Sequence, residues 1–317
     1  MRSQLAHLGY VPISGWPHVP HGLSFGGDAT SVATTADGGV IVFGRGPVPL
    51  LMFEASGAFL SATGEGEFDR PHSVVVDAAD NIYLVDAGGH FVQKRTQDGK
   101  ILLTLGDRGT AVAAHSGDYF NQPTDIAIHP ITGEMYISDG YGNSRIHRFD
   151  ADGKHIASWG APGSGPGEFS LPHGICLLDD DRIAVCDREN YRIQIFTSDG
   201  EFDTQWHCHR PCSVRTLRGS GLLFVAELGN PLQHTVPRTG SAVSVFDPGG
   251  KAVGRIGDSL PGMTPTGFTA PHGLAIDPAG DLYVAEVSYT YVTKLLGLDA
   301  PAGELVSLRK WTGASGR

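Results

Sequence analysis

The chain has 317 residues and a formal net charge of −11, with 23 Lys and Arg residues against 34 Asp and Glu residues. This acidic balance argues against nucleic acid and anionic membranes as partners, and no apolar run approaches the ~20 residues of a membrane-spanning helix. Four cysteines in a chain of this length are too few for a disulfide framework. Because residues 1–9 lack the apolar core of a signal peptide, we expect a cytoplasmic protein.

Three short stretches repeat one another at near-equal intervals, and each places a histidine directly after a proline. They read Arg70-Pro71-His72, Leu171-Pro172-His173 and Ala270-Pro271-His272. A weaker copy, Gln122-Pro123-Thr124, lies midway between the first two. The true period is therefore roughly 50 residues, within the range of propellers and solenoids. We call this position of the repeat the slot and its occupant the slot residue; histidine occupies the slot in every second repeat.

Each repeat has the same internal order of short alternating apolar runs separated by polar turns. In chain order, the runs are 74–76, 82–86 and 92–94, then 126–128, 135–139 and 145–149, then 183–187 and 192–196. Such runs are typical of antiparallel strands. Asp-Gly pairs are expected to join the outer strands, at Asp37-Gly38, Asp98-Gly99, Asp152-Gly153 and Asp199-Gly200.

The second run of each repeat ends in an acid or its equivalent, which gives six units: Gly44-Arg45, Asp86, Asp139, Asp187, Glu227 and Glu286. We therefore predict an all-β fold, a six-bladed β-propeller with four-stranded antiparallel blades. The expected organisation is a single domain over 1–317, with 1–24 as an N-terminal closing segment and 25–317 as blades. The segment before residue 25 and the end near 305–308 are expected to share a blade. A β-solenoid is the alternative.

In a ring of six, alternate slots give three points with near three-fold symmetry around the axis. Three imidazoles meeting there form a metal site, so we predict His72, His173 and His272 as ligands, with zinc preferred and iron(II) also suited. Thr30, Thr124 and either Cys212 or Ser213 fill the slot elsewhere, so the slot has no general need for histidine. The alternative is that each histidine packs or caps a strand.

Three further segments carry a family resemblance: 120–127, reading Phe-Asn-Gln-Pro-Thr-Asp-Ile-Ala; 138–146, which contains Asp-Gly-Tyr; and 187–194, which begins Asp-Arg-Glu-Asn. They resemble NHL-repeat propellers and, more narrowly, the peptidyl-α-hydroxyglycine α-amidating lyase family. The likeness runs from about residue 28 to about residue 292. That family cleaves the C–N bond of a peptidyl-α-hydroxyglycine, releasing an amide and glyoxylate.

The resemblance implies that the three histidines hold a catalytic zinc, that Tyr141 is catalytic, and that Arg45 and Arg188 handle the substrate. It also implies a small-molecule substrate bearing a carboxylate, which two arginines can hold bidentately. Other interpretations stay open. Tyr141 could only line the channel, Arg188 could be a structural arginine of the repeat, and Arg45 stands where other repeats carry an acid.

The chain departs from the family pattern at two places. The family has an acid after its third zinc histidine that contributes to a structural calcium site, but Gly273 stands there, which leaves calcium in doubt. The disulfides of the family would fall at Asn121 with Gly142 and at Ala184 with Ile195, and none of these is a cysteine. Loss of both bridges fits a reducing compartment.

The function predicted from the sequence is thus a zinc-dependent lyase acting on an N-acyl-α-hydroxyglycine or a related carbinolamide or hemiacetal. Two alternatives are a metal-dependent propeller lactonase or hydrolase and a non-catalytic NHL binding scaffold. Cysteine and histidine residues at 207–212 leave a second zinc as an alternative to Cys212 lining the channel. The longer loop at 230–238 is expected to cover the channel mouth.

Overall fold

The computed structural model describes residues 8–230, 239–258, 260, 262–300 and 305–313. Within these ranges the chain forms six four-stranded sheets, and the strands pair in antiparallel fashion inside one repeat. A β-solenoid would instead pair strands of successive repeats in parallel. The sheets are the blades of a six-bladed β-propeller, which confirms the predicted fold class. No helix in the described residues is long and apolar enough to span a membrane.

The chain divides into two compact units. One, the central unit, comprises Gly64–Val214, and the other, the flanking unit, comprises Met1–Thr63 and Arg215–Arg317. Each unit is described on its own. The single-domain organisation stays a prediction.

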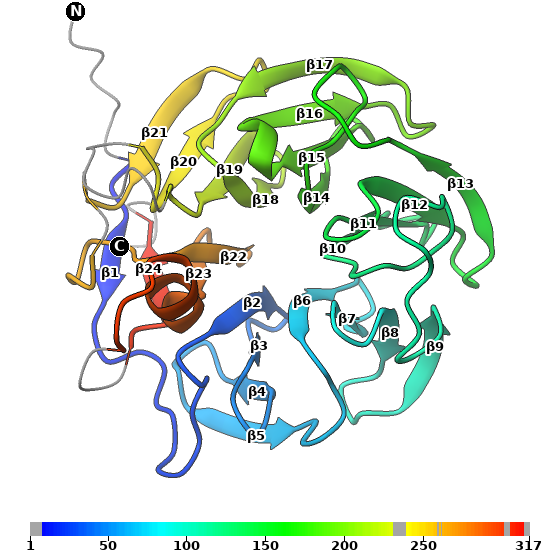
Figure 1. Cartoon of the computed structure of the whole chain (residues 1–317). Coiled ribbons are helices and arrows are strands. Elements are labelled where there is room, and N and C mark those ends of the chain that lie inside the picture. Colours follow the sequence, from blue (N-terminus) through cyan, green and yellow to red (C-terminus); the bar gives the residue numbers. More distant parts are fainter. Residues whose placement is uncertain (1–7, 231–238, 259, 261, 301–304, 314–317) are drawn as a thin grey trace, which may run out of the picture. The chain divides into compact units, whose positions relative to one another are not determined.

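The central unit contains three blades and one short 3₁₀ turn. Their bounds are β6 (Pro71–Val76), β7 (Ile82–Asp86), β8 (Phe91–Arg95) and β9 (Ile101–Leu105); β10 (Asp125–Ile128), β11 (Met135–Asp139), β12 (Arg145–Phe149) and β13 (His155–Trp159); β14 (Pro172–Leu177), β15 (Ile183–Asp187), η1 (Arg188–Asn190), β16 (Arg192–Phe196) and β17 (Phe202–His207). The first strands β6, β10 and β14 lie side by side (Figure 1). Two apolar clusters fill the space between neighbouring blades, one around Val85, Ile126 and Phe149 and the other around Tyr136, Ile175 and Phe196.

The flanking unit contains the other blades, and the unit boundary falls inside β18. The bounds are β2 (Ala29–Thr34), β3 (Val40–Gly44), β4 (Leu50–Phe53) and β5 (Phe59–Thr63); β18 (Pro211–Leu217), β19 (Leu222–Glu227), β20 (Ala242–Phe246) and β21 (Ala252–Ile256); β22 (Pro271–Ile276), β23 (Leu282–Glu286), the π-helical turn η2 (Thr290–Leu295), β24 (Leu308–Thr312) and β1 (Val11–Ile13). β1 pairs with β24 in the sheet of β22 and β23. The prediction that the two ends of the chain share a blade is therefore confirmed.

The Asp-Gly turns follow the prediction at three of four sites. Asp98-Gly99, Asp152-Gly153 and Asp199-Gly200 join the third and fourth strands of their blades. Asp37-Gly38 instead joins β2 to β3, so its assignment to outer strands was wrong. Gly38 has φ +88° and Asp37 Oδ1 accepts the N–H of Gly39. An Asp-Gly pair suits such a turn at any position in a blade.

Four of the acids that end the second strands, Asp86, Asp139, Asp187 and Glu286, are buried and hold the start of the first strand of the same blade. Asp86 accepts the backbone N–H groups of Asp69 and Arg70, each at 2.7 Å, just before His72. Asp139, Asp187 and Glu286 accept equivalent N–H groups in their own blades. A buried N–H left without a partner is costly. These acids therefore hold the backbone just before the slot residue of their blades in place.

Candidate functional site

All three predicted histidines lie at breaks in the ladder of their first strand. The pairing of β6 with β7 is broken between Pro71 and Ser73, which leaves His72 out of the ladder. Equivalent breaks surround His173 in β14 and His272 in β22. A β-bulge re-aims the side chain that it carries. All three imidazoles are buried, so the repeated bulge gives each of them the same local setting.

The Nδ1 atom of each histidine faces the backbone carbonyl of the slot residue in the next blade. The Nδ1–O distances are 2.5 Å from His72 to Thr124, 2.7 Å from His173 to Cys212 and 2.7 Å from His272 to Thr30. A carbonyl oxygen only accepts hydrogen bonds, so Nδ1 carries the hydrogen and Nε2 carries the lone pair. Metal-binding histidines are commonly held in this way.

Within the central unit, His72 and His173 form a close pair. Their ring centroids are 4.7 Å apart, and each offers a ligand atom within 4.8 Å of the other's. Asp125 holds the two strands together, because it accepts a hydrogen bond from Ser73 Oγ at 2.5 Å and one from the Ile175 N–H at 3.1 Å. The pair could hold a metal ion. His272 lies in the flanking unit, and its place as third ligand stays a prediction.

Tyr141 brings a phenol to this pair. Its oxygen lies 3.1 Å from Nε2 of His72 and 3.4 Å from Nε2 of His173. Gly140 lets the turn approach β14, since a Cβ at position 140 would lie 1.9 Å from the carbonyl oxygen of Pro172. The structure therefore places the predicted catalytic tyrosine at the nitrogens that would hold the metal.

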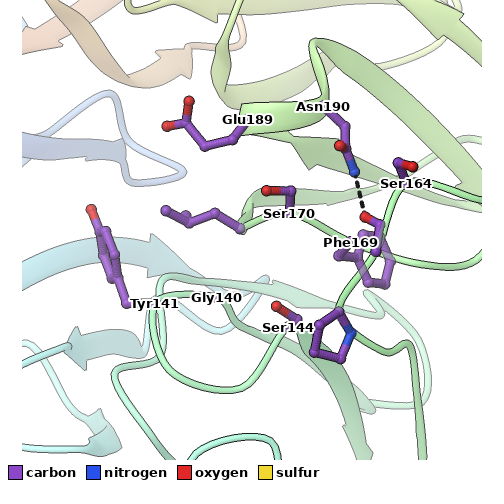
Figure 2. A pocket seen from close by; sticks show the side chains of 11 residues that line it. Gly140, Tyr141, Ser144, Ser164, Phe169, Ser170, Glu189 and Asn190 are labelled. Atoms are coloured by element: carbon purple, nitrogen blue, oxygen red, sulfur yellow. Dashed lines mark hydrogen bonds between the residues drawn. The ribbon is translucent and has the colours of Figure 1, made fainter.

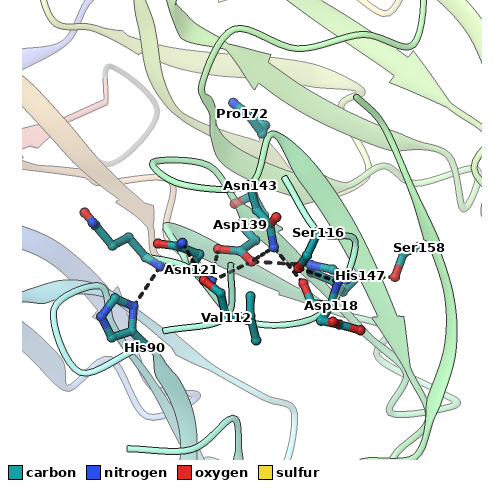
Figure 3. Close-up of polar contacts among 12 residues, drawn as sticks. His90, Val112, Ser116, Asp118, Asn121, Asp139, Asn143, His147, Ser158 and Pro172 are labelled. Carbon is teal, nitrogen blue, oxygen red and sulfur yellow. Dashed lines mark hydrogen bonds and ion pairs between the residues drawn. The ribbon is translucent and has the colours of Figure 1, made fainter. Parts of the chain in front are cut away.

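A buried polar network braces the turn that carries Tyr141 (Figure 3). The carboxylate of Asp139 accepts the Asn121 N–H and the Nδ2 hydrogen of Asn143, and Nε2 of His147 lies 3.4 Å away from it. The carbonyl of Asn121 in turn accepts the Gly142 N–H at 3.0 Å. The position of the phenol is thus set by several bonds behind it.

Two guanidinium groups lie against the ring of Tyr141. The Cζ atom of Arg70 is 4.6 Å from the ring centroid, and that of Arg188 is 5.7 Å away. Arg188 was predicted and is buried in η1. Burial alone would lower the pKa of Arg188, but its electrostatic interactions with Tyr141, Cys212 and Glu189 raise that pKa above its ordinary value. Arg188 therefore stays a cation.

Sequence reasoning missed Arg70, Arg210 and Glu189. Glu189 accepts from Nε of Arg188 at 2.9 Å and from two nitrogens of Arg210 at 2.8 and 3.1 Å. Burial tends to raise the pKa of Glu189, but the two guanidiniums outweigh it and hold that pKa below its usual value. The three arginines carry three positive charges and Glu189 carries one negative charge, so this group of side chains has a net positive charge. Arg70 and Arg210 both precede the proline of their repeat, a signal that alignment of the repeats could have shown.

Arg45, the other predicted arginine, lies in the flanking unit just after β3. Its NH1 atom is 3.1 Å from the buried carboxylate of Asp28 and 3.1 Å from Oγ1 of Thr290. Asp28 immediately precedes β2, so this blade reverses the pattern in which the acid follows the second strand. The role of Arg45 toward a substrate stays a prediction.

The departure at Gly273 has a steric cause. A Cβ at this position would lie 2.6 Å from Cα of Ser31 and 2.7 Å from the carbonyl oxygen of Thr30. A side chain there would force β22 away from β2. The acid that the resemblance implies for calcium therefore cannot stand at residue 273 with β2 where it is.

The positions where the family would carry disulfides are neighbours in this chain. Gly142 bonds to Asn121, and Ala184 pairs with Ile195 across β15 and β16. None of the four cysteines forms a disulfide, and all four are buried. Cys212 fills the slot of its blade and supplies the carbonyl that holds His173. The loop at 231–238, expected to act as a cover, lies outside the described residues.

The comparisons with known proteins agree with the resemblance. The NHL repeat model matches residues 169–196. Human NHL repeat-containing protein 3 is 30% identical over 306 residues, covering 90% of this chain and 84% of that protein. A Drosophila melanogaster peptidyl-alpha-hydroxyglycine alpha-amidating lyase is 30% identical over 283 residues, 80% of this chain and 50% of that protein. Rat peptidylglycine alpha-amidating monooxygenase is 37% identical over 169 residues, and the match covers 49% of this chain and only 17% of the rat protein.

Solved structures share the fold at low identity. A streptogramin B lyase aligns with a TM-score of 0.61 at 13% identity, covering 97% of this chain and 99% of that one. A gluconolactonase from Xanthomonas campestris aligns with a TM-score of 0.59 at 16% identity, covering 96% and 97%. At such identities the likeness concerns the fold alone.

Proposed function

The chain belongs to the NHL-repeat family, and we propose that it is a zinc-dependent lyase within that family. It would cleave the C–N bond of an N-acyl-α-hydroxyglycine to an amide and glyoxylate, or collapse a related carbinolamide or hemiacetal to its carbonyl compound. The observation that carries this proposal is the Tyr141 phenol, set between the Nε2 atoms of two histidines whose tautomers are fixed. The relatives named as amidating lyases support it at 30 and 38% identity.

The residues fit a zinc ion. Nε2 atoms with lone pairs are zinc donors, and three histidines would leave a fourth position for substrate. We propose His72 and His173 as two ligands and His272 as the third, because all three share the same bulge and the same Nδ1 bond. A zinc ion bound there would act as a Lewis acid toward a substrate oxygen. Iron(II) would suit the same nitrogens.

The remaining chemistry falls to the side chains around the pair. In the collapse of a carbinolamide the C–N bond breaks, the hydroxyl becomes a carbonyl, and the hydroxyl proton ends on the departing amide nitrogen. The Tyr141 oxygen would take this proton and relay it to the nitrogen. Negative charge that develops on the phenol oxygen would face the guanidiniums of Arg70 and Arg188, which lie against the ring. Their positive excess also suits the carboxylate of a hydroxyglycine. Arg45 stays a proposed third contact.

We further propose that the protein works in a reducing compartment such as the cytoplasm on a small carboxylate-bearing molecule. The four cysteines, none of which is in a disulfide, support the first point. The net charge of −11 supports the absence of nucleic-acid and anionic-membrane partners.

Two measurements on the same preparation test this function. Purified protein should carry about one zinc or iron(II) ion per chain and should release glyoxylate from α-hydroxyhippurate. His173→Ala should lose most of both the metal and the turnover, whereas His21→Ala, at an exposed histidine, should keep them. A metal-free but well-folded wild type would favour a non-catalytic scaffold. Metal without glyoxylate release would favour another propeller hydrolase.

A further inference from the structure

A pocket of about 440 Å³ opens beside Tyr141 in the central unit. Tyr141 lies at one end of the pocket, and Phe169 and Ser164 lie at the other (Figure 2). The side chain of Tyr141 therefore lies next to two different parts of the site. Its hydroxyl contacts the histidine pair, and the residue is also one of those that line the pocket.

We propose that this pocket binds the acyl group of the substrate and selects neutral acyl groups with an aromatic or branched apolar body. The inference rests on the proposed lyase function, because it takes the reacting carbon to lie near the Tyr141 hydroxyl. That carbon bears a hydroxyl, a carboxylate and an acylated nitrogen. The described residues that line the pocket include no Lys, Arg or His, so the carboxylate belongs with the arginines outside it and the acyl group is left for the pocket.

The wall has the chemistry that such a group needs. Pro162, Phe169 and Leu171 contribute apolar surface together with the Tyr141 ring, and Ser170 adds a small polar side chain. Small-molecule sites usually combine an apolar lining with a few polar groups. Small serines keep the space open, and a larger side chain at the rim would fill it.

The acid of the lining is already paired. Both oxygens of Glu189 accept hydrogen bonds from Arg188 or Arg210. Asn190 donates from Nδ2 to the carbonyl of Gly163 and to Asp187 (Figure 2 shows the first bond). A charged acyl group would lose its hydration without gaining an opposite charge, which is costly. The pocket therefore favours an uncharged occupant.

The test compares two uncleavable analogues that differ only in the acyl group. Hippurate and N-acetylglycine both keep the carboxylate and both lack the hydroxyl. Binding to the metal-loaded wild type is measured by calorimetry or ligand-observed NMR. Hippurate should bind about 10-fold more tightly, since the pocket removes much of its phenyl surface from water.

Ser164→Trp should reduce this preference to about 2-fold or less by filling the pocket. Ser164 is exposed, and the hydrogen bond that the Arg192 side chain donates to its backbone carbonyl does not depend on the side chain at position 164. Ser56→Trp, at an exposed turn of the flanking unit, is the matched control and should keep the wild-type preference. Equal binding of the two analogues by wild type, or an unchanged preference in Ser164→Trp, would overturn the acyl pocket.

The same proteins are then given α-hydroxyhippurate and N-acetyl-α-hydroxyglycine. Cleavage of both, with the benzoyl substrate impaired only in Ser164→Trp, supports the pocket and the lyase together. A hippurate preference that Ser164→Trp removes, without cleavage of either hydroxyglycine, keeps the pocket and rejects the lyase function.

Discussion

A histidine ligates a metal through a nitrogen that carries a lone pair, and in this chain three backbone carbonyls decide which nitrogen that is. The slot residues without histidine, Thr30, Thr124 and Cys212, supply these carbonyls. Their side chains can vary because the backbone makes the contact. This explains why the slot alternates between histidine and unrelated residues, and why its histidines share one tautomer.

The Tyr141 hydroxyl can be tested by removing one atom. Tyr141→Phe keeps the ring and its contacts with the arginines but removes the oxygen that lies near both Nε2 atoms. Turnover of α-hydroxyhippurate should fall by roughly 10²–10⁴-fold, the usual contribution of a proton-transferring group. Metal content should change little, which elemental analysis of the same sample checks. Turnover close to wild type would make Tyr141 a packing residue.

The geometry of Arg188 can be tested by keeping its charge. Arg188→Lys retains a cation but loses the Nε–H that Glu189 accepts and the planar fork that could pair with a substrate carboxylate. We expect kcat/KM for α-hydroxyhippurate to fall about 10–100-fold, the range for a lost charge-assisted bond. A matched carbinolamide without the carboxylate should be a poor wild-type substrate and little affected by the change. A wild type that prefers the uncharged substrate would show that the arginines serve another purpose.

At the scale of the elements, the site depends on how closely the Tyr141 turn approaches β14. Gly140→Ala would place a Cβ 1.9 Å from the Pro172 carbonyl oxygen, in the residue just before His173. We expect a loss of about 2–3 kcal/mol of unfolding free energy from this overpacking, and a loss of turnover because the phenol and the imidazole separate. Denaturant unfolding and the glyoxylate assay measure the two effects.

Gly262→Ala is the matched control, because nothing lies within 4 Å of a Cβ there. It should match the wild type in both measurements. A Gly140→Ala variant with wild-type stability would mean that the turn can move away from β14 freely.

The sequence predicted the elements well because each blade repeats its own pattern of strands, turns and terminal acid. It located His72, His173 and Tyr141, which the structure brings together. It missed Arg70 because its role depends on stacking against a ring in another blade, which no local pattern encodes. It missed Glu189 for a similar reason, since the carboxylate matters only once η1 and the start of β18 bring Arg188 and Arg210 to it.

At the scale of the whole chain, the structure shows which contacts stand where the family resemblance implies disulfides. The positions at which relatives of the amidating-lyase type would be bridged remain in contact here through a hydrogen bond and a strand pair. Backbone contacts of this kind hold the loop and the hairpin without a covalent link. The fold thus brings these positions together without a disulfide.

The state of the cysteines gives a prediction for the intact protein. None of the four cysteines is in a disulfide and all four are buried, and burial raises the pKa of Cys212 despite the guanidiniums of Arg188 and Arg210. Thiolates are the reactive species, so a thiol reagent should label almost none of them in the native state. Unfolding in denaturant without reductant should release all four at once, and added reductant should leave the thermal midpoint unchanged. Fewer than four reactive thiols after unfolding would reveal a bridge and would argue against a reducing compartment, whereas rapid labelling of the native protein would show that the Cys212 blade opens easily to solvent.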